Sequence, residues 1–249
     1  MRYEMSGGAI VGAREDQQDC AARVLTADGD ALLVVADGMG GHVGGEIASG
    51  LAVEAFVAHF EHYTRGPLPK RLEIALAMAN QALAALVRVE LELDGMGTTL
   101  LAAHLGADGL HWTSVGDSPL LLVRDGLIAR LNQDHSMVPV IERLVTAGRL
   151  TRAEADSHPE RSALLSVLTG LNTPDIIDSP AAPFPLREGD WIIAASDGIL
   201  TLALPEIARL AIDATSADTL VAALLGAVTA RGQLHQDNAT VEVVRVGSG

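Results

Sequence analysis

The sequence predicts an α+β fold of four layers, an α/β/β/α sandwich in which two mostly antiparallel β-sheets lie between layers of helices. Short apolar runs separated by turn signals fill the first and middle thirds of the chain. Connections this short allow hairpins but not helical crossovers, so neighbouring strands run antiparallel. Longer segments with apolar residues at helical spacing separate these strand groups and can cover each sheet.

The first third combines strands with a helical hairpin. Strands are predicted at residues 7–13, 21–27 and 31–36, and the turn sequence ADGD between the last two predicts a β-hairpin. Two helices follow, separated by Pro67 and Pro69. Their predicted apolar faces are Ile47, Leu51, Ala55 and Ala58 in the first helix, and Leu72, Leu76, Ala79, Leu83 and Leu86 in the second.

The remaining two thirds return to strands and close with helices around two further strands. Ser136 is the expected N-cap of a helix that ends near Gly148. The other predicted elements are strands at 97–105, 109–116, 119–126, 127–131, 190–196 and 239–246, and helices near 205–212 and 217–231. Because the sequence contains neither internal repeats nor segments that resemble linkers, we expect one domain over residues 1–249.

Composition excludes several classes of protein. Acidic residues outnumber basic ones by 32 to 17, a formal charge of -15, whereas a nucleic-acid-binding face must be basic. A single cysteine, Cys20, suits a reducing compartment. The N-terminal residues do not form a signal peptide, and we find no apolar run near the ~20 residues of a membrane span. We therefore expect a soluble, cytoplasmic, monomeric protein without nucleic-acid or membrane partners.

In the stretch VVADGMGGHVGGE, residues 34–46, the end of a predicted strand is followed by five glycines. A Walker phosphate loop would have lysine after Gly45, but Glu46 stands there and its carboxylate would repel phosphate. The dinucleotide fingerprint fails as well, because valine occupies position 43 where the third glycine belongs. A metal site is the remaining interpretation of this stretch.

Five aspartates lie at predicted strand edges throughout the chain. They are Asp19, Asp37, Asp117, Asp197 and Asp237. Each one alone is explained as a turn residue, since Asp-Gly and Asx turns are common. Together, converging carboxylates would repel each other unless cations lay between them. Hard oxygen ligands favour Mg²⁺ or Mn²⁺ over zinc, and a bridging carboxylate holds two ions ~4 Å apart.

These residues resemble a known family. The segments REDQQD, VVADGMGGH, GMGTTL, VGDS, NQDHS, ASDGIL and QDNATV occur in the order found in the metal-dependent (PPM, or type 2C) serine/threonine phosphatases, over about residues 7–246. Residues 142–170 resemble the flap of the bacterial branch, and we assign the flap to about 136–170. The resemblance implies hydrolysis of phosphoserine and phosphothreonine in proteins, and a Ser/Thr kinase as the opposing partner.

The resemblance also implies a role for each site residue. Asp37 would bridge two metal ions, with the Gly38 carbonyl on one of them. Asp197 and Asp237 would complete the coordination of one metal ion, and Asp19 would hold water bound to the other ion. Asp117 with Asp197 would bind an optional third ion. Arg14 would bind the phosphate, and His42 would protonate the leaving oxygen. Gln17, Pro119 and Ser162 depart from the family pattern without removing a ligand.

Other interpretations of these residues remain open. Arg14 could instead pair with Glu15 or Asp16 on the surface, and His42 could bond to Glu46. Adjacent Asp134 and His135 are expected to be structural, as are Thr98 and Thr99. A sibling hypothesis is a phosphatase dedicated to one small phosphoprotein, such as an anti-sigma-factor antagonist. The alternative from another class is a catalytically silent binding module, which would be expected to lack metal aspartates.

Overall fold

The computed structural model describes residues 1–248, except for the side chains of residues 41–43. Two five-stranded sheets form its centre. The first has the strand order β1-β10-β9-β7-β8, and the second has the order β2-β3-β5-β6 with β4 attached to β3. The strand pairs within the described residues are all antiparallel, as the sequence predicts. The strands are β1 (Arg2–Ile10), β2 (Asp19–Leu25), β3 (Ala31–Met39), β4 (Gly97–Thr98), β5 (Leu100–Gly106), β6 (Gly109–Val115), β7 (Leu120–Arg124), β8 (Leu127–Arg130), β9 (Trp191–Ala195) and β10 (Ala239–Gly247).

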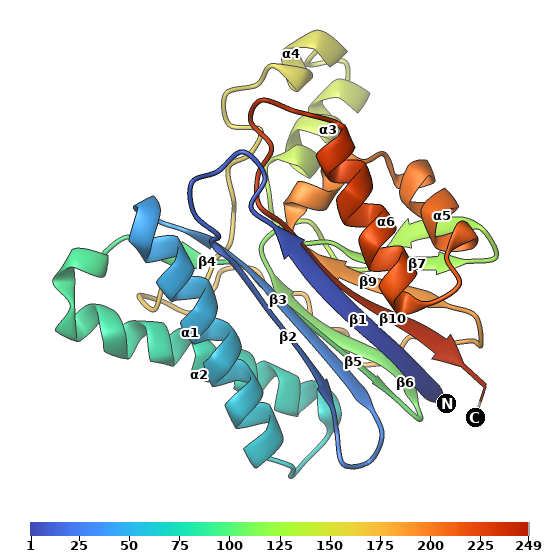
Figure 1. Ribbon diagram of the computed structural model, residues 1–249. Helices are drawn as coiled ribbons and strands as arrows, with labels where there is room; N and C mark the ends of the chain where they lie inside the picture. The colour runs from blue at the N-terminus through green and yellow to red at the C-terminus, as the bar shows by residue number, and fades with distance from the viewer. Residues whose placement is uncertain (249) are drawn as a thin grey trace.

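Helices cover the outer face of each sheet, which confirms the four-layer sandwich (Figure 1). Helices α1 and α2 lie on the second sheet, and α5 and α6 lie on the first. Helices α3 and α4 belong to a separate projection near the ends of the strands. The helices are α1 (Gly41–His62), α2 (Leu68–Val89), α3 (Val138–Thr146), α4 (Arg152–Asp156), α5 (Leu204–Asp213) and α6 (Ala217–Ala230), with short 3₁₀ segments η1 (Leu91–Leu93) and η2 (Asp197–Thr201).

Three apolar clusters hold these layers together. In β3 successive side chains alternate between two of them, as the pleat of a strand requires. Leu32 and Val34 pack under the helical hairpin, whereas Leu33 and Val35 pack between the two sheets. The third cluster joins the first sheet to α5 and α6. Because β3 is covered on both faces, its sequence is apolar throughout rather than alternating.

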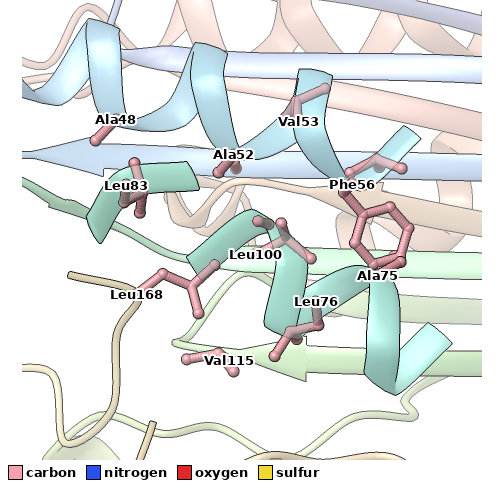
Figure 2. Packing of buried hydrophobic residues seen from close by; sticks show 14 of the residues in the cluster. Ala48, Ala52, Val53, Phe56, Ala75, Leu76, Leu83, Leu100, Val115 and Leu168 are labelled. Atoms are coloured by element: carbon pink, nitrogen blue, oxygen red, sulfur yellow. The ribbon is translucent and has the colours of Figure 1, made fainter. Parts of the chain in front are cut away.

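The buried face of α1 differs from the sequence prediction by one position. Ala48, Ala52, Phe56 and Phe60 are buried, whereas Ile47, Leu51 and Ala55 are only partly buried and Ala58 is exposed. Figure 2 shows Ala48, Ala52 and Phe56 facing the second helix and the sheet. Small alanines let the helix approach the sheet, and the phenylalanine rings fill the wider space further along. In α2, Leu72, Leu76, Ala79 and Leu83 are buried as predicted, but Leu86 only partly.

Smaller differences concern element boundaries. Strand β1 begins at Arg2 and ends at Ile10, earlier than predicted, because its whole length pairs with β10. Helix α3 starts at Val138, yet Ser136 still accepts a hydrogen bond of 3.2 Å from the Val138 N–H. Helix α2 is long and apolar enough to span a membrane, judged by its length and composition alone. The expectation that no apolar segment approaches the length of a membrane span is therefore wrong. Six residues of α2 are buried in this fold.

A buried histidine predicts how stability changes in acid. His104 on β5 is 4% exposed, with its Nε2 3.5 Å from Asp30 and its ring beside Phe60. Burial, together with the smaller effects of the charges of Arg71 and His111, lowers the pKa of His104 to about 4, against a smaller opposing effect of Asp108. Between pH 6.5 and about 4 this histidine is therefore protonated in the unfolded chain but remains neutral in the folded protein, so acid favours unfolding.

We expect this histidine to cost about 2 kcal/mol of stability as pH falls from 7 to 4.5. The measurement is the free energy of unfolding by urea at both values for the wild type and His104→Leu. The variant should lose less stability on acidification than the wild type. His62→Leu, at an exposed site at the end of α1, is the control. An equal pH dependence in all three proteins would contradict the assignment.

Candidate functional site

The ends of strands from both sheets meet at the edge of the sandwich from which α3 and α4 project (Figure 1). Asp37, near the end of β3, is the cross-strand partner of Asp19 at the start of β2. Asp197 directly follows Ser196 and β9, and Asp237 precedes β10, which pairs with β9. Because the pairs are antiparallel, the end of one strand and the start of its neighbour share an edge.

A cleft of about 280 Å³ opens at this edge. Most of the residues predicted for the site line it, namely Arg14, Asp37, Gly38, Asp117, Asp197 and Asp237. Asp19 is not among the lining residues; it is 9% exposed and lies beside Asp37 in the sheet. The side chain of His42 lies outside the described residues. Ser162 and Leu164 also belong to the lining.

Two Asp-Gly pairs shape the cleft through close backbone packing. A Cβ on Gly38 would lie 2.7 Å from the Gln18 carbonyl oxygen and still closer to the Gly45 carbonyl. A Cβ on Gly198 would collide with the Asn238 carbonyl and approach Ala239 Cα to 3.1 Å. Real side chains do not tolerate such contacts with backbone. Each aspartate is therefore followed by glycine because another segment passes directly against the turn.

The carboxylates of the cleft are held in an unfavourable environment for negative charge. Burial, together with the smaller effects of the charges of Asp197 and Asp134, raises the pKa of Asp117 to about 7, against an opposing effect of Arg130. Burial raises the pKa of Asp19 to about 6, against a hydrogen bond from Ser196. Burial and neighbouring carboxylates also raise the pKa values of Asp37 and Asp197. Arg14 is the one basic residue among the described lining residues, so the site has excess negative charge.

This donor set fits divalent cations. The Oδ1 atom of Asp19 is buried with no hydrogen-bond partner, and all the donors are hard oxygens. Among the described residues, no three acidic, histidine or cysteine side chains are already grouped as a metal cage. Two hydrogen bonds keep these carboxylates from forming such a group. Arg14 donates one to Asp237, and a side-chain hydrogen bond with Asp37 lowers the pKa of Asp197. The carboxylates therefore converge without yet enclosing a common point.

Arg14 lies on the loop between β1 and β2, directly opposite an aspartate. Its Nη2 is 2.6 Å from Oδ2 of Asp237, and this hydrogen bond raises the pKa of Arg14. The Asn238 side chain fastens the loop, since its amide donates to the carbonyls of Val11 and Asp16 and its Oδ1 accepts from Gln18. The arginine is thus held at the cleft by the residue after Asp237.

Several positioning residues escape the sequence analysis. The Asp37 N–H donates to Thr99 Oγ1 at 2.9 Å, and the Asp37 carbonyl accepts from the Thr99 N–H and the Thr98 hydroxyl. Thr99 Oγ1 also lies 2.8 Å from the Ser118 hydroxyl, next to Asp117. Ser196 donates to Asp19 at 2.7 Å. The sequence predicts the two threonines as ordinary strand residues. The sequence feature that could have indicated their contacts with Asp37 is their position in the segment GMGTTL.

Two of the three substituted positions of the family pattern make a hydrogen bond. Gln17 Oε1 accepts from the Asp19 N–H at 3.1 Å, and the Pro119 carbonyl accepts from the Ala195 N–H. Asp134 bonds to Arg130 and to the Ser136 N–H, and His135 Nδ1 accepts from the Gly116 N–H. Asp134 and His135 are thereby engaged in local structure, as expected.

Comparison with known proteins gives the same family as the motifs. The family model described as Protein phosphatase 2C matches residues 11–236. The chain is 39% identical over 171 residues to the serine/threonine protein phosphatase PstP of Mycobacterium tuberculosis, covering 69% of this chain. That alignment covers 32% of the PstP sequence, so it spans about a third of this relative.

Solved structures are similar over the whole chain. The crystal structure of the serine/threonine phosphatase PstP/Ppp of Mycobacterium tuberculosis has a TM-score of 0.82 and 32% identity, covering 100% of both chains. The catalytic domain of PstP in complex with two manganese ions has a TM-score of 0.80 and 30% identity, covering 99% of each chain. Similarity at this level shows the same fold and chain path.

Proposed function

Because the chain belongs to the protein phosphatase 2C family, we propose that it is a metal-dependent phosphatase acting on phosphoserine and phosphothreonine in proteins. The observation that carries this proposal is the cleft itself. Asp37, Asp117, Asp197 and Asp237 meet there from separate segments, with Asp19 buried beside Asp37. So many carboxylates that are buried or partly buried beside one arginine need cations to be stable together.

We assign the cofactor as two Mg²⁺ or Mn²⁺ ions. Asp37 would bridge them, and the Gly38 carbonyl, Asp19, Asp197 and Asp237 would complete their surroundings. Asp117 and Asp197 could hold a third ion. When bound, such ions bring the pKa of water toward ~7 and neutralise phosphoryl oxygens. The two manganese ions of the PstP structure support the choice of a divalent metal.

The residues of the chain then bind and orient the phosphate. Arg14 presents a planar fork that matches two phosphoryl oxygens, and its exposed position lets it exchange Asp237 for phosphate. In our proposal, His42 donates a proton to the serine or threonine oxygen that leaves. The cleft is open toward solvent and toward the flap, which suits a large phosphoprotein.

The relatives' names support the substrate and partner assignments. PstP is named as a serine/threonine protein phosphatase, so we infer phosphorylated proteins as substrates and a Ser/Thr kinase that opposes this enzyme. We further propose a monomer with one domain over residues 1–249 and a flap at 136–170. The lone cysteine, Cys20, favours a cytoplasmic location.

The direct test is hydrolysis of p-nitrophenyl phosphate and of a phosphothreonine peptide with added Mn²⁺ or Mg²⁺. Both should be hydrolysed with metal and neither after chelation, and activity should return when the ion is restored. A thermal melt of the same samples shows whether the protein binds the ion. Metal binding without any hydrolysis would favour the silent binding module over the phosphatase.

Thr99 gives a prediction about how the proposed bridging carboxylate is positioned. Its hydroxyl connects the Asp37 N–H to Ser118, so Thr99→Val should disturb both neighbours of the cleft. Loss of such an outer partner typically costs 10–100-fold in metal affinity or activity. We expect the Mn²⁺ concentration for half-maximal thermal stabilisation to rise about tenfold.

Two matched variants make this result specific. Thr99→Ser keeps the hydroxyl and should remain within about twofold of the wild type. Thr113→Val removes a hydroxyl that is also buried but has no hydrogen-bond partner, and it should leave Mn²⁺ binding unchanged. Equal effects of Thr99→Val and Thr113→Val would show that the Thr99 contacts do not position the site.

A further inference from the structure

A second hollow of about 280 Å³ adjoins the candidate cleft. Residues 164–167, 169 and 172–175 line it, and we call it the side groove. Leu164 lines both the side groove and the cleft that contains Asp37. The two hollows are therefore neighbours, so a polypeptide whose phosphorylated residue lies in the cleft can extend past Leu164 into the side groove.

The walls of the side groove are fixed by hydrogen bonds and by a buried anchor. The Ser166 hydroxyl donates to the Ile176 carbonyl and accepts from the Ile176 N–H, at 2.9 and 3.0 Å, which closes the loop between them. Leu168 exchanges two backbone hydrogen bonds with Thr98. Figure 2 shows the Leu168 side chain directed toward the helical layer. A preformed groove orders little on binding, which favours affinity.

The exposed face of the side groove is partly apolar. Leu165 is exposed and Val167 is half-buried, and both line the groove beside the buried Ser166. Leu165 is 40% exposed. Pro174 contributes to the lining as well. Polar residues, among them Thr169 and Asn172, line the rest of the groove, and the neighbouring cleft is rich in carboxylates, so the two hollows suit different parts of one substrate.

We propose that the side groove binds the substrate polypeptide beside its phosphorylated residue and selects an apolar side chain there. Because Leu164 lines both hollows, the selected residue lies close to the phosphorylated one along the substrate chain. This inference rests on the proposed phosphatase function and adds a preference among phosphoproteins. A good apolar contact of this kind changes kcat/KM about tenfold or more.

The test compares two phosphoserine peptides that differ only in having leucine or serine at the three flanking positions on each side. The wild type should favour the leucine peptide about tenfold in kcat/KM. Leu165→Ser should reduce that preference to about twofold. Leu171→Ser is the matched control, since Leu171 is 65% exposed and is not part of the side groove. It should retain the wild-type preference.

The preference ratio separates this inference from the proposed function. Hydrolysis of both peptides with no preference, or an unchanged preference in Leu165→Ser, would overturn the side-groove assignment and leave the phosphatase intact. Failure to hydrolyse either peptide or p-nitrophenyl phosphate with Mn²⁺ would overturn the function. In that case fluorescence anisotropy of the two labelled peptides, on the wild type and both variants, decides the binding preference.

Discussion

Replacing Asp37 with asparagine is expected to reduce Mn²⁺-dependent phosphate hydrolysis by about 1,000-fold or more. Outer partners of metal ligands typically account for 10–100-fold, and Asp37 is the proposed bridge between both ions. The cleft supports this assignment because Asp37 lies beside Asp19 and is influenced by the charges of Asp19, Asp197, Asp117 and Asp237. Removal of its negative charge should weaken the hold on both ions.

The same substitution should leave the metal-free protein as stable as the wild type or more stable. Burial raises the pKa of Asp37 well above its usual value, so keeping it ionised at pH 7.5 opposes folding. Its contribution is favourable below the unfolded pKa near 3.9 and is lost as pH rises through the folded value. Asparagine removes this penalty, so the chelated variant should melt at or above the wild-type temperature.

Two measurements together check this prediction. Steady-state hydrolysis with saturating Mn²⁺ reports the loss of activity, and thermal melts with and without Mn²⁺ report metal binding. The wild type should gain thermal stability from the ion and the variant should gain much less. Full activity in Asp37→Asn would disprove the role of Asp37 in holding the metal ions. A variant that is inactive because it is unfolded would be recognised by its melt.

Gly38→Ala is expected to destabilise the protein by about 3 kcal/mol or more. The added Cβ would enter the space of the Gly45 and Gln18 carbonyl groups, and backbone cannot rotate away as a side chain can. For a chain of this length, 3 kcal/mol corresponds to a fall in melting temperature of roughly 6–12 °C. Activity should fall as well, since Asp37 would move with its neighbour.

Gly50→Ala is the matched control for this clash. Gly50 lies within α1, and a Cβ there would have open space around it. Alanine is favoured over glycine inside a helix by about 0.5–1 kcal/mol, so this variant should melt higher than the wild type. Differential scanning calorimetry of both metal-free variants gives the comparison. A Gly38→Ala protein that melts like the wild type would show that the two segments can separate at little cost.

The sequence predicts the architecture well because its signals are local. Turn residues such as those at 27–30 connect strands that pair directly, and the Asp-Gly pairs at 37–38 and 197–198 lie where apolar strands end. The face of α1 is harder to predict. Its sequence is apolar on most sides, so the sizes of Phe56 and Phe60, rather than periodicity, determine which side is buried.

Positioning residues could not be predicted for a different reason. Thr99 contacts Asp37 across 62 positions of sequence, and Ser196 contacts Asp19 across 177. A threonine in a strand has the same local pattern whether its hydroxyl orients a carboxylate or only packs, as Thr113 does. Such roles depend on which strands become neighbours, and that information lies in the assembled sheets.

The hydrogen bond between Ser196 and Asp19 joins residues of different sheets, because Asp19 begins β2 and Ser196 follows β9. The proposed metal ligands are divided in the same way, with Asp37 on the second sheet and Asp237 leading into β10 of the first. Bound ions would link the two sheets of the sandwich through these ligands. Occupancy of the site then adds directly to the free energy of folding, by about 2.7 kcal/mol at one hundred times the dissociation constant. Removal of the ion would in this way weaken the association of the two sheets as well as the catalytic activity.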